Sequence, residues 1–131
     1  MSVHEQKLWK SKDILESHFG DSIEELLFQP KLSRIKLRLR DNNLIFVQYN
    51  DYGEYSYSII FSNIKLDRCR FDNYDDRWEI STRPHHFHPR KSKKGFKSKM
   101  VGDPEHDIPL LFDLYISGNL FLTDFRFPKI S

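Results

Sequence analysis

Alternating apolar and charged residues dominate the middle of the chain. Residues 34–40 alternate without exception between a cation and an aliphatic residue. Because successive side chains of a strand point to opposite faces, this run predicts a strand with one apolar and one basic face. Turn residues at 41–43 and the apolar run 44–49 predict the returning strand of a hairpin. The side chains that this pattern places in the core are Ile35, Leu37 and Leu39.

Three further short runs have the character of strands. Residues 54–61, 64–71 and 78–82 are rich in aromatic and β-branched residues and are separated by turn residues. In the second of these runs, alternation places Arg68 and Arg70 on one side of the strand. The short connections between successive strands favour an antiparallel meander of about five strands.

Helical signals lie at both ends of the chain. Residues 1–20 have a loosely apolar face and end on a glycine, which predicts a helix. Ser22 and Glu25 have the spacing of a capping box, so we expect a second, short helical segment that ends at Pro30. The run Asp103-Pro104-Glu105 is a helix-start signal, because it combines an N-cap residue, a proline at the first helical position and an acid near the positive end of the helix dipole.

These elements together predict the class of fold. After the C-terminal helix, residues 120–127 are expected to be extended, as an edge strand. Helices at both ends of a run of strands indicate an α+β fold, in which an antiparallel sheet carries both helices on one face and leaves its other face free to be basic. We expect residues 1–131 to form a single domain.

Composition narrows the class of protein. Of the 131 residues 38% are hydrophobic and 15% are aromatic, which is too many for a disordered chain. The single cysteine, Cys69, excludes an internal disulfide and fits a reducing compartment. No apolar signal segment or bilayer-spanning run is visible, so we expect a soluble cytoplasmic protein that does not interact with a membrane.

The net charge of +2 conceals two basic blocks, one at residues 31–40 and one at 83–99. Such segregation favours binding to a polyanion such as RNA. For the cations at 34–40 a solvated outer face that suppresses aggregation is an equally good interpretation. Aromatic residues such as Tyr74 and Trp78 would suit base stacking, although most aromatics at period two are core residues. The cations predicted to bind nucleic acid are Arg34, Lys36, Arg38, Arg40, Arg83, Arg90, Lys91, Lys93, Lys94, Lys97 and Lys99.

The histidine cluster His85, His86 and His88 lies between two prolines and directly before the second basic block. Histidine titrates nearest neutrality, so a cluster beside cations suits proton transfer at an anionic substrate or metal ligation. In an extended chain His86 and His88 share a face and His85 points away. A metal site would need further ligands such as His106 or Asp107, which the spacing does not demand, so we expect no metal and no cofactor. A hydrogen-bonded structural role is the competing interpretation.

Four segments in this order resemble the TumE-type toxin family, over about residues 35–115. They are 54–57 (Glu-Tyr-Ser-Tyr), 70–73 (Arg-Phe-Asp-Asn), 80–88 (Ile-Ser-Thr-Arg-Pro-His-His-Phe-His) and 103–108 (Asp-Pro-Glu-His-Asp-Ile). The resemblance implies the toxin of a toxin–antitoxin pair, with a helix-turn-helix antitoxin as partner, and it leaves residues 118–131 as an extension. It also implies that the three histidines are functional and are supported by Arg70, Asp72 and Asn73.

Two departures from the family pattern bear on activity. Ser58 stands where the family tends to have a histidine, and Asp75-Asp76 begins the segment where it tends to have a histidine pair. We therefore carry three hypotheses. The first is an RNA-binding toxin that cleaves RNA without metal, one histidine acting as general base and another as general acid. The second is a non-enzymatic protein whose basic surface binds an acidic partner or antitoxin. The third is a metal-dependent nuclease. The oligomeric state and the RNA target stay open.

Overall fold

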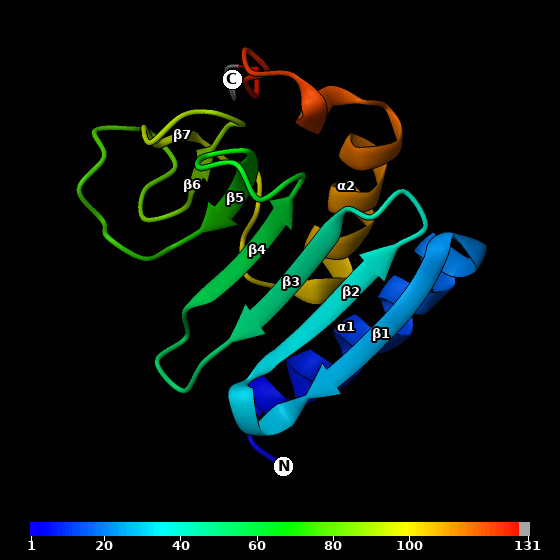
Figure 1. Ribbon diagram of the computed structural model, residues 1–131. Helices are drawn as coiled ribbons and strands as arrows, with labels where there is room; N and C mark the ends of the chain where they lie inside the picture. Colours follow the sequence, from blue (N-terminus) through cyan, green and yellow to red (C-terminus); the bar gives the residue numbers. More distant parts are fainter. Residues whose placement is uncertain (129–131) are drawn as a thin grey trace.

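A seven-stranded antiparallel sheet forms the frame of the protein in a computed structural model that describes residues 1–128 (Figure 1). Neighbours in the sheet are neighbours in the sequence, so the sheet is a meander, as predicted, with more strands than the five expected. Its strands are β1 (Ile23–Gln29), β2 (Arg34–Leu39), β3 (Leu44–Tyr49), β4 (Tyr55–Ile60), β5 (Arg68–Asp72), β6 (His86–His88) and β7 (Phe96–Lys97).

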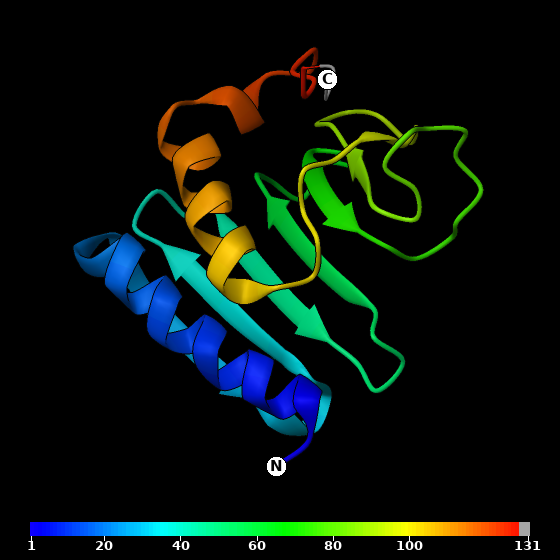
Figure 2. The same cartoon turned by 180° about the vertical axis from the view of Figure 1, so that it is seen from behind.

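Two helices cover one face of the sheet, and the other face carries none (Figures 1 and 2). Helix α1 spans Val3–Phe19 and packs against β3 and against α2, which spans Pro104–Ile116. Short 3-10 turns occupy Gly20–Ser22, Pro30–Leu32 and Asn119–Phe121. These helices confirm the predicted α+β class, and in residues 1–128 neither is long and apolar enough to cross a bilayer.

Strand alternation divides the side chains between the two faces as the pattern predicted. Ile35, Leu37 and Leu39 of β2 are buried under the helices, and the cations between them lie on the open face. On β5, Cys69 and Phe71 are buried in the same core while Arg68 is exposed. The sheet therefore has an apolar helix-covered face and an open polar face, and the open face carries His86, His88, Arg70 and Asp72 among the functional candidates.

The short helix expected from Ser22 to Pro30 is wrong, because this segment contains β1. Strand β1 pairs along β2 from Ile23 to Gln29, and its Leu26 and Phe28 pack against the core. A capping box satisfies two backbone amides, whereas a full strand pairing satisfies a whole row of them and also covers the edge of β2. The long-range pairing outweighs the local signal.

Two other predicted strands are also absent from the described part of the chain. Residues 78–80 are irregular and residues 81 and 82 begin a turn, so no strand forms there, and residues 120–127 form the last 3-10 turn and irregular chain instead of an edge strand. The latter segment packs Phe127 against Phe71 and Phe87, with ring centroids 5.9 and 5.6 Å apart. It therefore covers the apolar side of β5 and β6, and residues 129–131 of the predicted extension lie outside the described residues.

A buried polar chain ties the helices to the sheet. The Tyr57 hydroxyl donates to a carboxylate oxygen of Asp107 over 2.8 Å, and the Tyr49 hydroxyl lies 2.7 Å from that of Tyr57. Asp107 also accepts the backbone N–H groups of Val101 and Gly102, at 3.0 and 2.7 Å. Because the Asp107 side chain is fully buried, these donors replace the water that it loses on folding.

Candidate functional site

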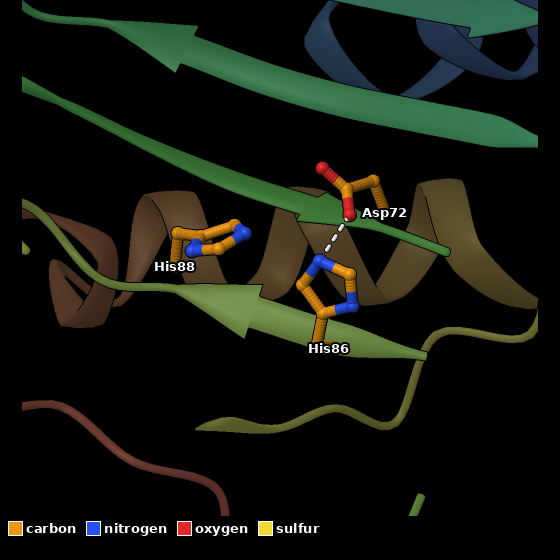
Figure 3. Close-up of side chains that lie close together, drawn as sticks. All are labelled: Asp72, His86 and His88. Atoms are coloured by element: carbon orange, nitrogen blue, oxygen red, sulfur yellow. Dashed lines mark ion pairs between the residues drawn. The ribbon is translucent and has the colours of Figure 1, made fainter. Parts of the chain in front are cut away.

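The register of β5 and β6 brings the candidate residues together on the open face. Asp72 is paired with His86 and Arg70 with His88, so the four side chains form two adjacent rows. His86 and His88 stand on the same face, with ring centroids 4.7 Å apart, as alternation predicted. Figure 3 shows both imidazoles beside the Asp72 carboxylate, which is at the end of the neighbouring strand.

Asp72 is the centre of this cluster. Its carboxylate is completely buried and forms ion pairs with the guanidinium of Arg70 and with Nε2 of His86, whose side chain is 2% exposed. The second ring nitrogen of His86, Nδ1, donates to the carbonyl of Pro84 over 2.9 Å. Burial opposes a charged ring, but the hydrogen bond and the negative charge of Asp72 outweigh this effect, so the pKa of His86 is raised. Both nitrogens of His86 are thus engaged within the protein.

His88 has the opposite electrostatic environment. Burial lowers the pKa of this ring, and the positive charge of Arg70 lowers it further. Nδ1 of His88 donates to the carbonyl of Lys94 over 3.2 Å, and no protein group within residues 1–128 bonds Nε2. His88 is therefore a neutral imidazole with an available lone pair on Nε2.

His85 lies on the helix-covered side, as the alternation of adjacent side chains along an extended chain predicted. Its Nδ1 is 2.9 Å from the hydroxyl of Tyr55, and burial lowers the pKa of the ring. His106 lines the same shallow surface pocket as His85, and its Nδ1 lies 2.7 Å from Asp107. The sheet separates these residues from Asp72, so His106 and Asp107 do not join His86 and His88 as metal ligands.

A pocket of about 350 Å³ opens beside His88, at the end of the sheet formed by β5 and β6. The indole of Trp78 forms part of its wall and meets the His88 ring edge-on, at 5.8 Å between centroids. The single acid of the lining is Asp75. Its cations are Arg68, Arg70, Arg77 and Lys93. A pocket with this excess of positive charge suits a phosphate group.

Two of the cations that were predicted to bind nucleic acid, Arg90 and Lys91, form ion pairs within the protein. Arg90 donates to the buried carboxylate of Asp67 over 2.5 Å, and Lys91 lies 3.6 Å from the same group. The hydrogen bonds from Arg90 and from Ser62 lower the pKa of Asp67 to about 2. The first two cations of the basic loop are therefore held by an acid that lies just before β5, which offsets one of their two charges.

Two other predicted cations are paired with surface acids. Arg83 bonds Asp76 at 2.9 Å, and Arg40 bonds Glu24 at 2.9 Å. Lys99 lines the pocket of His85 on the other side of the sheet. Of the second basic block, Lys93 is the one that lines the pocket beside His88.

The basic strand β2 lies on the open face but at a distance from the pocket. Arg34 and Lys36 lie over the ring of Phe46 on β3, at 5.5 and 6.0 Å from its centroid. Three strand spacings, about 14 Å, separate β2 from β5. These cations would meet the same ligand only if it were an extended chain crossing the sheet.

Asn73 has a structural role at the start of β4. Its side-chain carbonyl accepts the backbone N–H of Tyr55 over 2.9 Å, and its amide donates to the carbonyl of Gly53 over 3.2 Å. Of the three residues that the family resemblance added, Arg70 and Asp72 enter the cluster and Asn73 does not.

Sequence reasoning missed two residues of the pocket as functional candidates, Arg68 and Arg77. Arg68 was predictable, because it shares a strand face with Arg70 two residues later. Arg77 had no such signal. Its guanidinium lies 4.7 Å from the Trp78 ring in an irregular loop, and only the folded path of residues 73–85 brings it to the pocket.

The fold and the site define a small α+β protein with a basic pocket beside a buried Asp–His pair. Comparison with known families identifies the class further: the sequence model of the family described as Toxin TumE matches residues 10–116. The chain therefore belongs to the TumE toxin family. This family places it among the toxins of toxin–antitoxin systems and implies an antitoxin partner. No curated protein and no solved structure matches the chain.

Proposed function

We propose that this protein is a toxin that binds and cleaves RNA at the basic pocket beside His88. The observation that carries the proposal is the composition of that pocket, which combines Arg68, Arg77 and Lys93 with an aromatic wall and one neutral histidine. Phosphate groups supply most of the affinity in protein–RNA contacts, and aromatic rings stack on bases without sequence preference. The pocket offers cations for phosphate groups and an aromatic ring for bases, and both lie next to the reactive imidazole of His88.

The two histidines have different parts in this proposal. Acid–base catalysis by a histidine pair requires a free nitrogen on each ring, and His86 has none because Asp72 and Pro84 occupy both. His88 keeps a free Nε2 at the pocket wall. We therefore assign the contact with the phosphodiester to His88, and to His86 the positioning of Asp72 and of the pocket wall.

Arg70 connects these two parts. Its side chain is 45% exposed, lines the pocket and at the same time pairs with the buried Asp72. A guanidinium held in place before the substrate arrives stabilises the extra negative charge of a phosphoryl transition state without reorganising. The buried acid thus holds a substrate-facing cation in position.

The binding part of the proposal is tested with single-stranded RNA in a salt titration. The variant Arg68→Gln/Lys93→Gln removes two pocket cations that form no ion pair within the described residues. Each contact with a single-strand phosphate contributes about 0.7 to the slope of log affinity against log salt, so we expect the slope to fall by about 1.4. The matched control Lys7→Gln/Lys31→Gln removes equal charge from α1 and from the turn after β1, and within the described residues neither lysine forms an ion pair. Equal slopes in both variants would refute binding at this pocket.

Cleavage is tested with tag-free protein and total RNA at low salt. We expect fragments from the wild type and none from the variant His86→Ala/His88→Ala, with the circular dichroism spectrum of that variant showing that it is folded. The single variant His88→Gln, at a partly exposed position, should lose cleavage and toxicity on expression. RNA cleavage that persists in pure His88→Gln protein would remove His88 from the mechanism.

A second function, a non-enzymatic interaction protein, is favoured by one observation. Ser58 is paired with Arg70, which is in turn paired with His88, so this departure from the family pattern lies in the row of the candidate site. A member that has lost a histidine there would keep the basic surface for a partner. It would show salt-sensitive binding to an acidic partner and no RNA turnover.

We also propose that the antitoxin implied by the family is a helix-turn-helix protein, as the resemblance suggests. Co-expression with the product of the adjacent gene tests this pairing. Copurification of a helix-turn-helix protein that also suppresses toxicity supports it, and suppression by a partner of another class overturns it.

A further inference from the structure

Three side chains of the open face converge in the way that a metal site requires. Asp72, His86 and His88 each offer one ligand atom, and these atoms all lie within 4.8 Å of one another (Figure 3). In a tetrahedral site, ligand atoms at about 2.0–2.2 Å from the ion lie about 3.4 Å from one another, so shifts of about 1–1.5 Å, which open the contact of Asp72 with His86 and bring the ring of His88 nearer, complete such a site. From these contacts we infer that Asp72, His86 and His88 bind a divalent transition-metal ion of the zinc type.

The hydrogen bonds behind the two imidazoles give the first argument. Each ring donates Nδ1–H to a backbone carbonyl, His86 to Pro84 over 2.9 Å and His88 to Lys94 over 3.2 Å. This leaves Nε2 of each ring as the ligating nitrogen. Metal-binding histidines are almost always oriented in this way, because a bond on the outer nitrogen holds the tautomer and the ring plane.

The buried carboxylate gives the second argument. Asp72 is fully buried, and Arg70 neutralises it from one side by pairing with Oδ2. The other oxygen, Oδ1, faces Nε2 of His86 directly. A carboxylate oxygen and an imidazole lone pair repel each other unless a proton or a cation lies between them. A metal ion that binds at this point would replace the Nε2 proton of His86, which is released to solvent, and would be bound by both atoms.

The surroundings give the third argument and also indicate the class of ion. The indole of Trp78 lies beside the two histidines, tilted to His86 at 6.3 Å and edge-on to His88 at 5.8 Å between ring centroids. Two imidazoles and one carboxylate are ligands of Zn²⁺ and its first-row neighbours, whereas Mg²⁺ and Ca²⁺ prefer oxygen alone. Three protein ligands leave a further position open, as in catalytic zinc sites.

The open position would face the basic pocket. His88 and Arg70 line that pocket, whereas Asp72 and His86 are buried behind them. An ion at this point would contact an oxygen of a phosphate held by the pocket cations and polarise it. This last step, unlike metal binding itself, rests on the proposed function.

The experiment is calorimetric titration of metal-stripped, tag-free protein with Zn²⁺ and, separately, with Mg²⁺. We expect one Zn²⁺ per chain and no heat of binding from Mg²⁺. The variant His88→Gln should weaken Zn²⁺ binding at least tenfold and abolish the rise in Tm that Zn²⁺ gives the wild type. The control His106→Gln, a half-exposed histidine on α2, should keep the wild-type affinity. Absence of Zn²⁺ binding by the wild type, or equal affinity in the two variants, would overturn the inference.

An RNA assay of the same preparations separates the metal site from the proposed function. Cleavage that stops in EDTA and returns with Zn²⁺ supports both. Zn²⁺ binding that depends on His88, in a protein that leaves RNA intact, keeps the metal site and removes the nuclease. Cleavage by protein that binds no Zn²⁺ removes the metal site and keeps the nuclease.

Discussion

The free energy of unfolding should fall when Asp67 is protonated, because its ion pair with Arg90 holds the end of the sheet in place. Asp67 lies just before β5, is buried, and accepts hydrogen bonds from Arg90 and Ser62, each over 2.5 Å. Arg90 also donates to the carbonyl of Phe121 over 3.2 Å, so the pair joins the loop after β6 to the C-terminal segment. Removing the carboxylate charge should therefore loosen both segments.

The magnitude follows from the pKa of Asp67, which is lowered from 3.8 to about 2. One pKa unit corresponds to 1.36 kcal/mol, so the hydrogen bonds from Arg90 and Ser62 and the nearby positive charges together stabilise the folded state by about 2.5 kcal/mol through Asp67. Because the pKa is depressed in the folded state, this contribution is complete above about pH 4 and is lost as the pH falls through about 2. It is a substantial part of the 5–15 kcal/mol that is typical of a small protein.

The assay is urea unfolding of the wild type and Asp67→Asn between pH 7 and pH 2. We expect the variant to be about 2 kcal/mol less stable at pH 7 and the difference to shrink toward zero near pH 2. Other carboxylates titrate in both proteins, so the difference isolates Asp67. The control Asp124→Asn, at an exposed position, should change the free energy of unfolding by less than about 0.5 kcal/mol. A difference between wild type and Asp67→Asn that is independent of pH would refute the reasoning.

Two further substitutions examine the core and the pocket wall. Tyr57→Phe removes the hydroxyl that lies between Tyr49 and Asp107. It should lower the free energy of unfolding by about 1–2 kcal/mol without changing RNA affinity. Unchanged stability in guanidinium unfolding would contradict the role of the buried polar chain. Gly95→Ala places a Cβ 2.7 Å from the Trp78 ring, so the indole must move, with a loss of about 1–3 kcal/mol and weaker RNA binding. Wild-type tryptophan emission and RNA affinity in Gly95→Ala would show that the ring does not need this contact.

The alternation of apolar and polar residues predicted the central strands of the sheet, because one face of each of these strands is apolar and the other is polar. The alternation around Ile35 and Leu37 is readable residue by residue, and their burial under the helices follows from it. Strand β1 was not readable in this way. Its Leu26 and Phe28 were next to a capping-box signal, and only the pairing with β2 decides between a helix and a strand for such a segment.

The candidate site was predictable in part for the same reason. His86 and His88 share a face by period two, and the family resemblance added Arg70 and Asp72. Their opposition across β5 and β6 depends on the register of two strands that are separated by a long irregular loop. No local pattern contains that register, and a slip of β6 by one residue would have turned His86 and His88 toward the core and away from Asp72.

The sequence by itself determined the α+β class, the two faces of the sheet, the shared face of His86 and His88, and membership of a toxin family. Only the tertiary structure decided which cations are free to bind a ligand and which are paired within the protein. It neutralises Arg90 with Asp67, a pair 23 residues apart, and leaves Lys93 at the pocket. The physical reason is that strand periodicity is a local property of the backbone, whereas the energy of a charge depends on every group that folding brings to it.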